Sequence, residues 1–220
     1  MINVADLVKK QSLKGNYFAF DAYIQGDFES GLVENRRGDR LLALPETLIS
    51  AIHMGLETEL GSASKLVLFN CGRWWGKNFY KRFSEQVSGY YSKPLAEMEM
   101  IELLQCLKQC WKAHGWGTFE LDLSSYQQGF LLVEITNSIF AKEASGDPMP
   151  SCFLEAGILS AIFSQLSGKE LHCLQISCES LQADRNRFVI GLAERLAPVT
   201  GWLEEQQNWS TIWQNLGGSK

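Results

Sequence analysis

The segment that decides the fold of this chain runs from residue 152 to residue 188 and reads CFLEAGILSAIFSQLSGKELHCLQISCESLQADRNRF. Its first part, 152–168, carries apolar residues at helical spacing and ends at Gly168, which predicts a helix with a glycine stop. Two short apolar runs follow, at 170–177 and 187–192, and predict two strands. The segment therefore predicts a helix followed by paired strands.

The sequence on either side of this segment extends the same architecture. Residues 118–123 and 130–136 alternate or run apolar, with Gly129 between them, as in an antiparallel pair. Turn residues divide 15–45 and predict short strands or an extended arm. Apolar periodicity with glycine or proline stops predicts four further helices, over 45–60, 64–88, 95–113 and 191–206, the last kinked or broken by Pro198. We therefore expect an α/β (α+β) fold with helices packed on a small, mostly antiparallel sheet.

Composition excludes several classes of protein. Hydrophobic residues make up 45% and charged residues 20% of the 220, which are ordinary globular values. The net charge of -5, with basic residues scattered, gives no phosphate-binding face, so nucleic acid is not an expected partner. No apolar run approaches the ~20 residues that span a bilayer, and the N-terminal stretch lacks the apolar core of a secretory signal. We expect a cytoplasmic protein, with peripheral contact to a membrane as the alternative, whose six cysteines are reduced thiols or metal ligands.

Four segments together resemble the 4-vinyl-reductase (V4R) domain family. They are GDRLLALP (38–45), CGRWWGKNFYKRF (71–83), GWGTFEL (115–121) and the segment 152–188. The family occurs in bacteriochlorophyll-pathway proteins and as the sensor domain of aromatic-responsive transcriptional activators. Its fold, the NO-signalling and Golgi-transport ligand-binding type, is shared with vesicle-tethering trafficking subunits. The resemblance implies an N-terminal arm over 1–37, a ligand-binding domain over 38–192 and a C-terminal helix or tail over 193–220.

The resemblance also places a metal site whose chemistry has changed. At the positions where metal-binding members carry cysteine, glutamate, cysteine and cysteine, this chain has Cys152, Gln175, Cys178 and Asn186. Two anionic ligands have become amides, so we expect no tight zinc site. Cys173 and His172 are candidate substitutes. On an extended strand, however, Cys173 and Gln175 share one face with Ser177 while Cys178 points to the opposite face, so rescue of the site by these substitutes needs a bulge. The alternative is that both cysteines are small buried side chains at an abandoned site.

Aromatic residues supply the candidate ligand-binding surface. In the family fold, their segments should converge between the helices of 64–113 and the hairpin of 118–136. An aromatic-lined cavity there would fit a planar apolar ligand, whereas a plain hydrophobic core is the alternative interpretation. Axial ligands to a pigment metal are conceivable from His53, His114 and the pair Cys106 and Cys110. The six candidate ligand-binding residues are Trp75, Phe79, Trp111, Trp116, Phe130 and Phe153.

These observations favour a binding protein over an enzyme. The sequence has no dinucleotide fingerprint, P-loop, nucleophile elbow or zinc-protease motif, and no catalytic residue is assigned. The resemblance implies a chlorophyll-type tetrapyrrole as the ligand, with a role in pigment synthesis, pigment delivery or photosystem assembly. The alternatives are a ligand-free protein–protein adaptor like the trafficking relatives, a sensor of small aromatic compounds, and a component of a vinyl reductase.

Two kinds of protein contact are also expected. The resemblance implies a homodimer, because relatives pair through N-terminal and helical surfaces, and the aromatic arm over 17–28 would otherwise expose apolar surface. Near the C-terminus, Trp202, Trp209 and Trp213 are spaced to share one helical face. That face either packs on the domain or docks a protein partner or a membrane interface.

Overall fold

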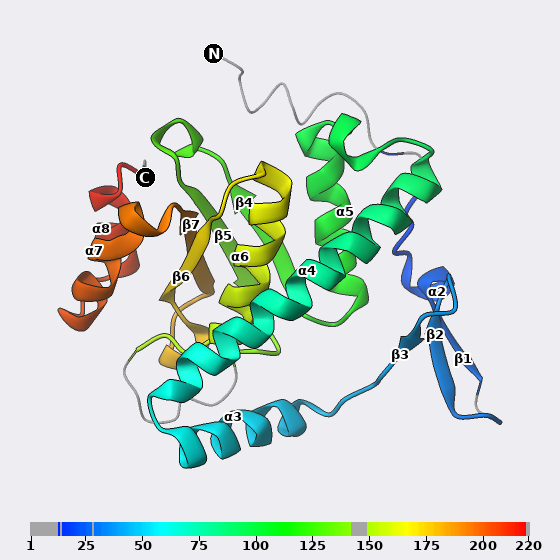
Figure 1. Ribbon diagram of the computed structural model, residues 1–220, viewed down its shortest axis with the longest axis horizontal. Helices are drawn as coiled ribbons and strands as arrows, with labels where there is room; N and C mark the ends of the chain where they lie inside the picture. The colour runs from blue at the N-terminus through cyan, green and yellow to red at the C-terminus, as the bar shows by residue number, and fades with distance from the viewer. Residues whose placement is uncertain (1–12, 14, 28, 142–148, 219–220) are drawn as a thin grey trace. The chain divides into compact units, whose positions relative to one another are not determined.

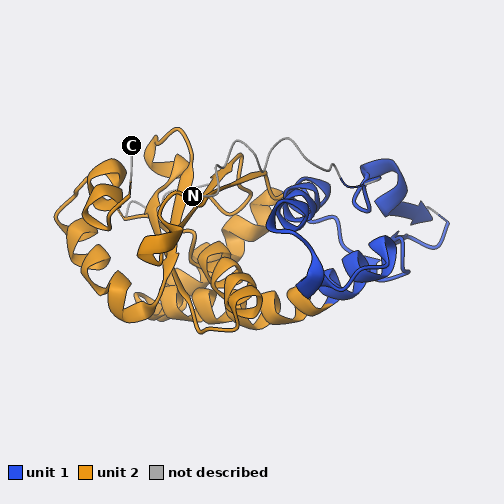
Figure 2. Ribbon diagram, turned by 90° about the horizontal axis from the view of Figure 1, so that it is seen from above, with its two compact units in different colours: residues 1–45, 82–115 blue, residues 46–81, 116–220 orange. Residues whose placement is uncertain are grey.

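The computed structural model describes residues 13, 15–27, 29–141 and 149–218, and divides the chain into two compact units. The first unit is formed by residues 1–45 and 82–115, and the second by residues 46–81 and 116–220 (Figure 2). One long helix, α4 (Ala63–Tyr91), contributes to both units. In the described parts of the chain, no helix is long and apolar enough to cross a membrane.

The first unit combines a small sheet with two helical segments. Helix α2 (Phe20–Tyr23) leads into strands β1 (Ile24–Asp27), β2 (Leu32–Asn35) and β3 (Arg40–Leu41), which pair antiparallel in that order. The short strands predicted within 15–45 are therefore present. The helical part contains the end of α4, a 3-10 turn η1 (Leu95–Glu97) and helix α5 (Met100–Ala113).

Helix α5 begins later than its periodicity predicts. A single helix over 95–113 was the expectation, but Glu99 and Glu102 form a capping box that starts the helix at Met100. The carboxylate of Glu102 also pairs with Lys93 at 2.8 Å. A capping box satisfies amide groups that the first helical turn leaves unpaired, and so sets the helix start locally.

The second unit is built on a four-stranded antiparallel sheet. Its strands are β4 (Thr118–Asp122), β5 (Leu131–Thr136), β6 (His172–Ser177) and β7 (Asn186–Gly191), in the order β4-β5-β7-β6. The predicted hairpin and the two later strands are confirmed, each within a few residues. Helix α3 (Glu46–Leu60) precedes α4, and helix α6 (Phe153–Ser167) ends at Gly168 in the left-handed conformation, as predicted.

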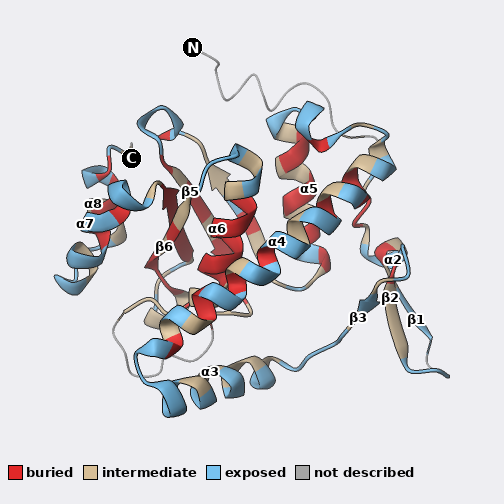
Figure 3. Ribbon diagram, in the orientation of Figure 1, coloured by how far each residue is buried: buried red, intermediate tan, exposed pale blue. Residues whose placement is uncertain are grey.

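The sheet buries both of its faces. Leu132, Leu174 and Val189 are cross-strand neighbours, and they pack in one cluster with helices α7 (Ala193–Glu204) and α8 (Trp209–Asn215). Side chains alternate between faces along a strand, so the neighbours Val133 and Phe188 point to the opposite face, which α6 covers (Figure 1). All six residues of β7 are buried (Figure 3).

Glycines allow α4 and α6 to approach closely. A Cβ atom on Gly72 would collide with the carbonyl oxygen of Leu154, and one on Gly157 with the carbonyl oxygen of Phe69. A Cβ on Gly76 would lie 2.9 Å from the Cβ of Ala161. Because most of these obstacles are backbone atoms, larger side chains would separate the helices.

The C-terminal tryptophans do not share one helix, which corrects the expectation from their spacing. Helix α7 continues through Pro198, and the break comes later, where Gln206 adopts a positive φ of 57° and the Asn208 side chain caps α8. Trp213 is 3% exposed and Trp209 packs on the same core cluster. The alternative in which these residues pack on the domain is therefore confirmed.

Candidate functional site

An aromatic cluster in the second unit brings together three of the predicted ligand-binding residues. Trp75 and Phe79 lie one turn apart on α4, and their rings stack with centroids 5.0 Å apart. Trp116 meets both, at 5.2 Å from Trp75 and 5.3 Å from Phe79. Phe140, which follows β5, adds a fourth ring at 6.4 Å from Trp116. These four residues are called the aromatic cluster below.

The aromatic cluster is not part of the closed core. The side chain of Trp75 is 42% exposed, and the other three members are half-buried. Trp116 is held beside the end of β5 because the next residue, Gly117, has a φ of 110° and its backbone lies against the carbonyl group of Thr136. A residue with a side chain rarely adopts this conformation. The cluster thus presents partly open aromatic rings, and open rings of this kind can bind a flat apolar group.

The remaining predicted ligand-binding residues lie elsewhere. Trp111 is fully buried on α5 in the first unit. Phe130 belongs to the core cluster under α7 and α8, with the guanidinium of Arg195 at 4.5 Å from its ring. Phe153 begins α6 and is half-buried, with the ammonium of Lys65 at 5.7 Å from its ring. Sequence reasoning did not single out Phe140, whose only signal is its position just after a predicted strand.

A second cluster gathers the four residues at the altered metal positions. Cys152 is the N-cap residue of α6, Gln175 lies in β6, Cys178 follows β6 and Asn186 begins β7. The sulfur atoms of Cys152 and Cys178 are 3.6 Å apart, and all four side chains are buried. A register irregularity between Gln175 and Ser177 places a bulge in β6 just before Cys178. We call these four residues the dithiol cluster.

Hydrogen bonds satisfy the amides of the dithiol cluster from within the protein. Gln175 Oε1 accepts from the backbone amide of Cys152 at 2.9 Å, while Gln175 Nε2 donates to Cys152 Sγ and to Asn186 Oδ1 at 3.2 and 3.1 Å. Asn186 Nδ2 donates to Glu179 Oε2 at 2.6 Å and to the Ile135 carbonyl at 3.3 Å. The two amides therefore link α6, β6 and β7 without a bound ion.

The candidate substitutes do not complete a metal site. The His172 ring packs against Phe69 with centroids 4.8 Å apart, and Cys173 is buried with its pKa raised by desolvation. Within the ranges that the structure describes, no group of three or more His, Cys, Asp and Glu side chains is placed to hold a metal ion. The expectation that the dithiol cluster lacks tight zinc stays a prediction for metal analysis.

The two thiols of the dithiol cluster differ in acidity. Hydrogen bonds from the Cys152 thiol and from Ser180 lower the pKa of Cys178 to about 6. The same contact, together with desolvation, raises the pKa of Cys152 well above its usual value. The contact between the two thiols therefore favours the thiolate on Cys178 over the thiolate on Cys152.

The first unit contains three of the residues considered for axial ligation of a pigment metal, His114, Cys106 and Cys110, whereas His53 lies on α3 in the second unit. His114 Nε2 lies 3.3 Å from the Tyr23 hydroxyl, and Nδ1 lies 2.8 Å from the Cys110 carbonyl oxygen. Burial lowers the pKa of His114 and raises that of Cys106 to about 12. Both ring nitrogens of His114 are thus engaged within the unit, and neither is directed at an open site.

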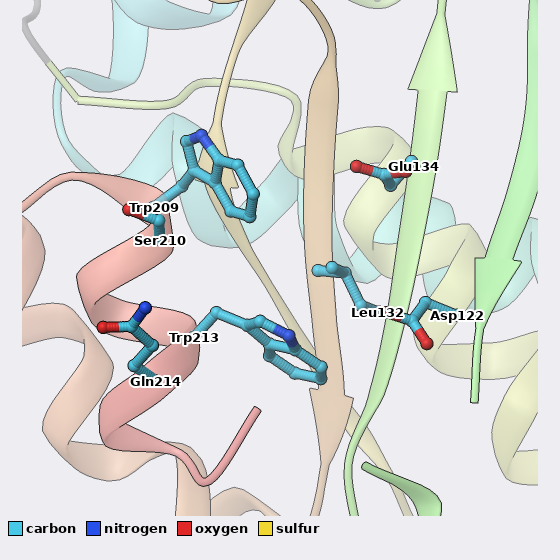
Figure 4. A pocket seen from close by; sticks show the side chains of 7 residues that line it. All are labelled: Asp122, Leu132, Glu134, Trp209, Ser210, Trp213 and Gln214. Carbon is cyan, nitrogen blue, oxygen red and sulfur yellow. The ribbon is translucent and has the colours of Figure 1, made fainter. Parts of the chain in front are cut away.

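A small cleft lies beside α8 (Figure 4). Its volume is about 140 Å³, well below the ~300 Å³ at which ligand pockets usually begin. The carboxylate of Glu134 pairs with Arg185 at 3.1 Å and Arg187 at 2.8 Å, and the guanidinium of Arg187 lies 3.8 Å from the Trp209 ring centre. The carboxylate of Glu134, a polar residue of the cleft lining, is therefore held in ion pairs within the protein. The cleft is lined by Asp122, Leu132, Glu134, Trp209, Ser210, Trp213 and Gln214.

The helices packed on an antiparallel sheet define an α+β fold. Residues 131–192 match the family model of the V4R domain, which confirms the resemblance predicted from the sequence. No curated protein matches the chain by sequence.

Two solved structures share this fold at low sequence identity, and a third aligns with a lower score. The phenol-responsive sensory domain of the transcription activator PoxR, with phenol, is 14% identical with a TM-score of 0.62, covering 86% of this chain and 94% of that one. Trafficking protein particle complex subunit 3 from Naegleria fowleri, covalently bound to palmitic acid, is 11% identical with a TM-score of 0.53, covering 67% and 92%. A vinyl-4-reductase family protein from Methanocaldococcus jannaschii is 15% identical with a TM-score of 0.45, covering 68% and 82%.

Proposed function

We propose that this protein binds a planar apolar small molecule on the aromatic cluster and catalyses no reaction on it. The observation that carries the proposal is the convergence of four partly exposed rings: Trp75, Phe79 and Trp116 lie 5.0–5.3 Å apart, and Phe140 lies 6.4 Å from Trp116. Open aromatic side chains at this density leave apolar area to be covered, and a flat ligand would stack on it.

The fold supports binding as the class of function. Two proteins of similar fold hold small apolar molecules, phenol in one and palmitic acid in the other. Neither ligand follows from the fold alone, because one fold serves many functions. Among planar ligands we propose a chlorophyll-type tetrapyrrole, carried during pigment synthesis or photosystem assembly, because the V4R resemblance includes pigment-pathway proteins.

A ligand titration tests both the identity of the ligand and the position of its binding site. A vinyl-bearing porphyrin is added to the purified protein, and tryptophan fluorescence and melting temperature are followed, with phenol and palmitic acid as parallel ligands. We expect saturable quenching near one porphyrin per chain. Ligand at a hundredfold excess over its dissociation constant should add about 2.7 kcal/mol to the free energy of unfolding.

Neighbouring tryptophans on α4 provide a matched pair of variants. Trp75 belongs to the aromatic cluster, whereas the adjacent Trp74 is 72% exposed. Trp75→Ala should weaken binding about tenfold, because an aromatic contact contributes roughly 0.5–1.5 kcal/mol beyond its buried area. Trp74→Ala should bind like the parent. Equal affinities for the two variants would place the ligand elsewhere.

A specific observation favours a second candidate, a protein–protein adaptor. Helix α3 has no buried residue, and its exposed apolar side chains include Leu48, Ile52, Met54 and Leu60. Apolar surface of this kind marks a protein contact, including contact with a second copy of the chain. If porphyrin, phenol and palmitic acid all leave melting and fluorescence unchanged, the adaptor function replaces the ligand-binding one.

A further inference from the structure

The dithiol cluster contains two buried thiols for which the proposed ligand-binding function has no use. Cys152 and Cys178 are 26 residues apart in the sequence and lie on different elements, yet their sulfur atoms are 3.6 Å apart. Each residue is 1% exposed. The distance is close to van der Waals contact between two sulfur atoms, so the fold already holds the pair side by side.

We propose that Cys152 and Cys178 form a reversible disulfide bond that joins the start of α6 to the end of β6. A disulfide bond is ~2.05 Å long, so the two sulfur atoms need to approach by roughly 1.5 Å. Both residues stand where backbone is irregular, Cys152 at a helix N-cap and Cys178 just after the β6 bulge. The approach therefore need not break a regular helix or strand.

The surroundings of the two sulfur atoms give them different roles. Cys178 Sγ lies 3.0 Å from the Ser180 hydroxyl, and Cys152 Sγ lies 3.2 Å from Gln175 Nε2, which donates to it. A hydrogen bond from the Ser180 hydroxyl would stabilise a thiolate on Cys178. We therefore assign Cys178 as the nucleophile and Cys152 as the thiol that resolves the oxidised intermediate.

A hydroperoxide is the oxidant that fits a buried pair, because hydrogen peroxide is little larger than water. The Cys178 thiolate attacks one peroxide oxygen, so an S–O bond forms, the O–O bond breaks, and hydroxide leaves. Cys152 sulfur then attacks Cys178 sulfur, so the S–S bond forms and the S–O bond breaks. The departing hydroxide takes the Cys152 proton. Two thiols and one hydrogen peroxide thus become one disulfide and two water molecules.

The bond would reinforce a connection that hydrogen bonds already make. Gln175 and Asn186 link the same elements through their amides. Closing a loop of this length by a disulfide restricts the unfolded chain, and in a protein of this size the melting temperature should rise by about 10 °C. Oxidation would therefore change how firmly α6 is held on the sheet.

The test treats the folded wild-type protein with a small excess of hydrogen peroxide, quenches it, and measures the intact mass and the tryptic peptides. We expect the chain to lose the mass of two hydrogen atoms, the peptides containing Cys152 and Cys178 to become linked, and a dithiol reductant to reverse both changes. The linkage should precede oxidation of the exposed Cys71. The rise in melting temperature is measured on the same samples.

Cys173 shares a tryptic peptide with Cys178, so single variants are needed to assign the bond. Cys178→Ser should abolish the link, whereas Cys173→Ser, at a buried cysteine on the same strand, should keep it. The wild-type mass measurement stands even if a variant fails to fold. The proposal is overturned if the folded protein gains oxygen without losing hydrogen, if the link forms only after unfolding in urea, or if it persists in Cys178→Ser.

Discussion

Replacing Gly157 with alanine tests the close approach of α4 and α6. The new Cβ would collide with the Phe69 carbonyl oxygen and lie 3.0 Å from both Arg73 N and Gly72 Cα. These are backbone atoms of α4, so no side chain can rotate away. Overpacking of this kind costs about 3 kcal/mol at the upper end of its range, while alanine in place of a helical glycine returns up to ~1 kcal/mol. The free energy of unfolding should fall by about 2 kcal/mol.

The control is Gly89→Ala, in α4 itself, where an added Cβ meets no atom within 4 Å. That variant should be more stable than the parent by at most ~1 kcal/mol. Urea unfolding followed by tryptophan fluorescence measures both free energies. Gly72→Ala with Gly157→Ala should be less than additive, because both change one helix contact. Equal stabilities for Gly157→Ala and Gly89→Ala would refute the packing argument.

Three other changes have defined outcomes. Wild-type protein purified without chelator should carry no stoichiometric zinc by metal analysis, and one zinc per wild-type chain would contradict this. The double variant Gln175→Glu with Asn186→Cys should bind zinc, because the two changes restore the negative charge and the ligand atoms of the site. We expect a homodimer by light scattering at micromolar concentration, weakened by Ile52→Lys on the exposed face of α3; a monomer throughout would refute it. Arg187 lowers the pKa of the Asp184 carboxyl from 3.8 to about 2. The ion pair between the two residues therefore stabilises the folded state above the usual carboxyl pKa, and this stabilisation is lost as the pH falls through about 2. Asp184→Asn should flatten the fall in melting temperature over that interval, and an unchanged profile would show that the pair is unimportant.

Much of the secondary structure could be predicted from local signals. Pro45 and Gly61 bracket α3, and Gly168 ends α6 with a φ of 67°. These residues act through their own backbone preferences, so their effect needs no knowledge of distant segments. Where the local signal was a side-chain hydrogen bond, as for Glu99, the predicted helix start was wrong, because periodicity alone does not locate a cap.

The candidate sites were predictable only in part. The resemblance to the V4R family brought Cys152, Gln175, Cys178 and Asn186 into one hypothesis, and the structure places them together. The bulge that puts Gln175 and Cys178 beside Cys152 depends on how β6 pairs with β7. The sequence of β6 alone does not specify this pairing. The distance of 3.6 Å between the two sulfur atoms, and hence the proposed disulfide, follows from that pairing.

The sequence by itself determined most of the order of helices and strands, because that order follows from the chemistry of each residue and its near neighbours. The positions of the altered metal site came from the resemblance to the V4R family. Only the tertiary structure decided that Trp75, Phe79 and Trp116 meet Phe140, while Phe130 lies in the core with Trp213. The physical reason is that apolar burial is non-directional. Burying any of these aromatic rings would remove apolar surface from water. The pairing of strands and the packing of helices select which rings are buried and which remain partly exposed.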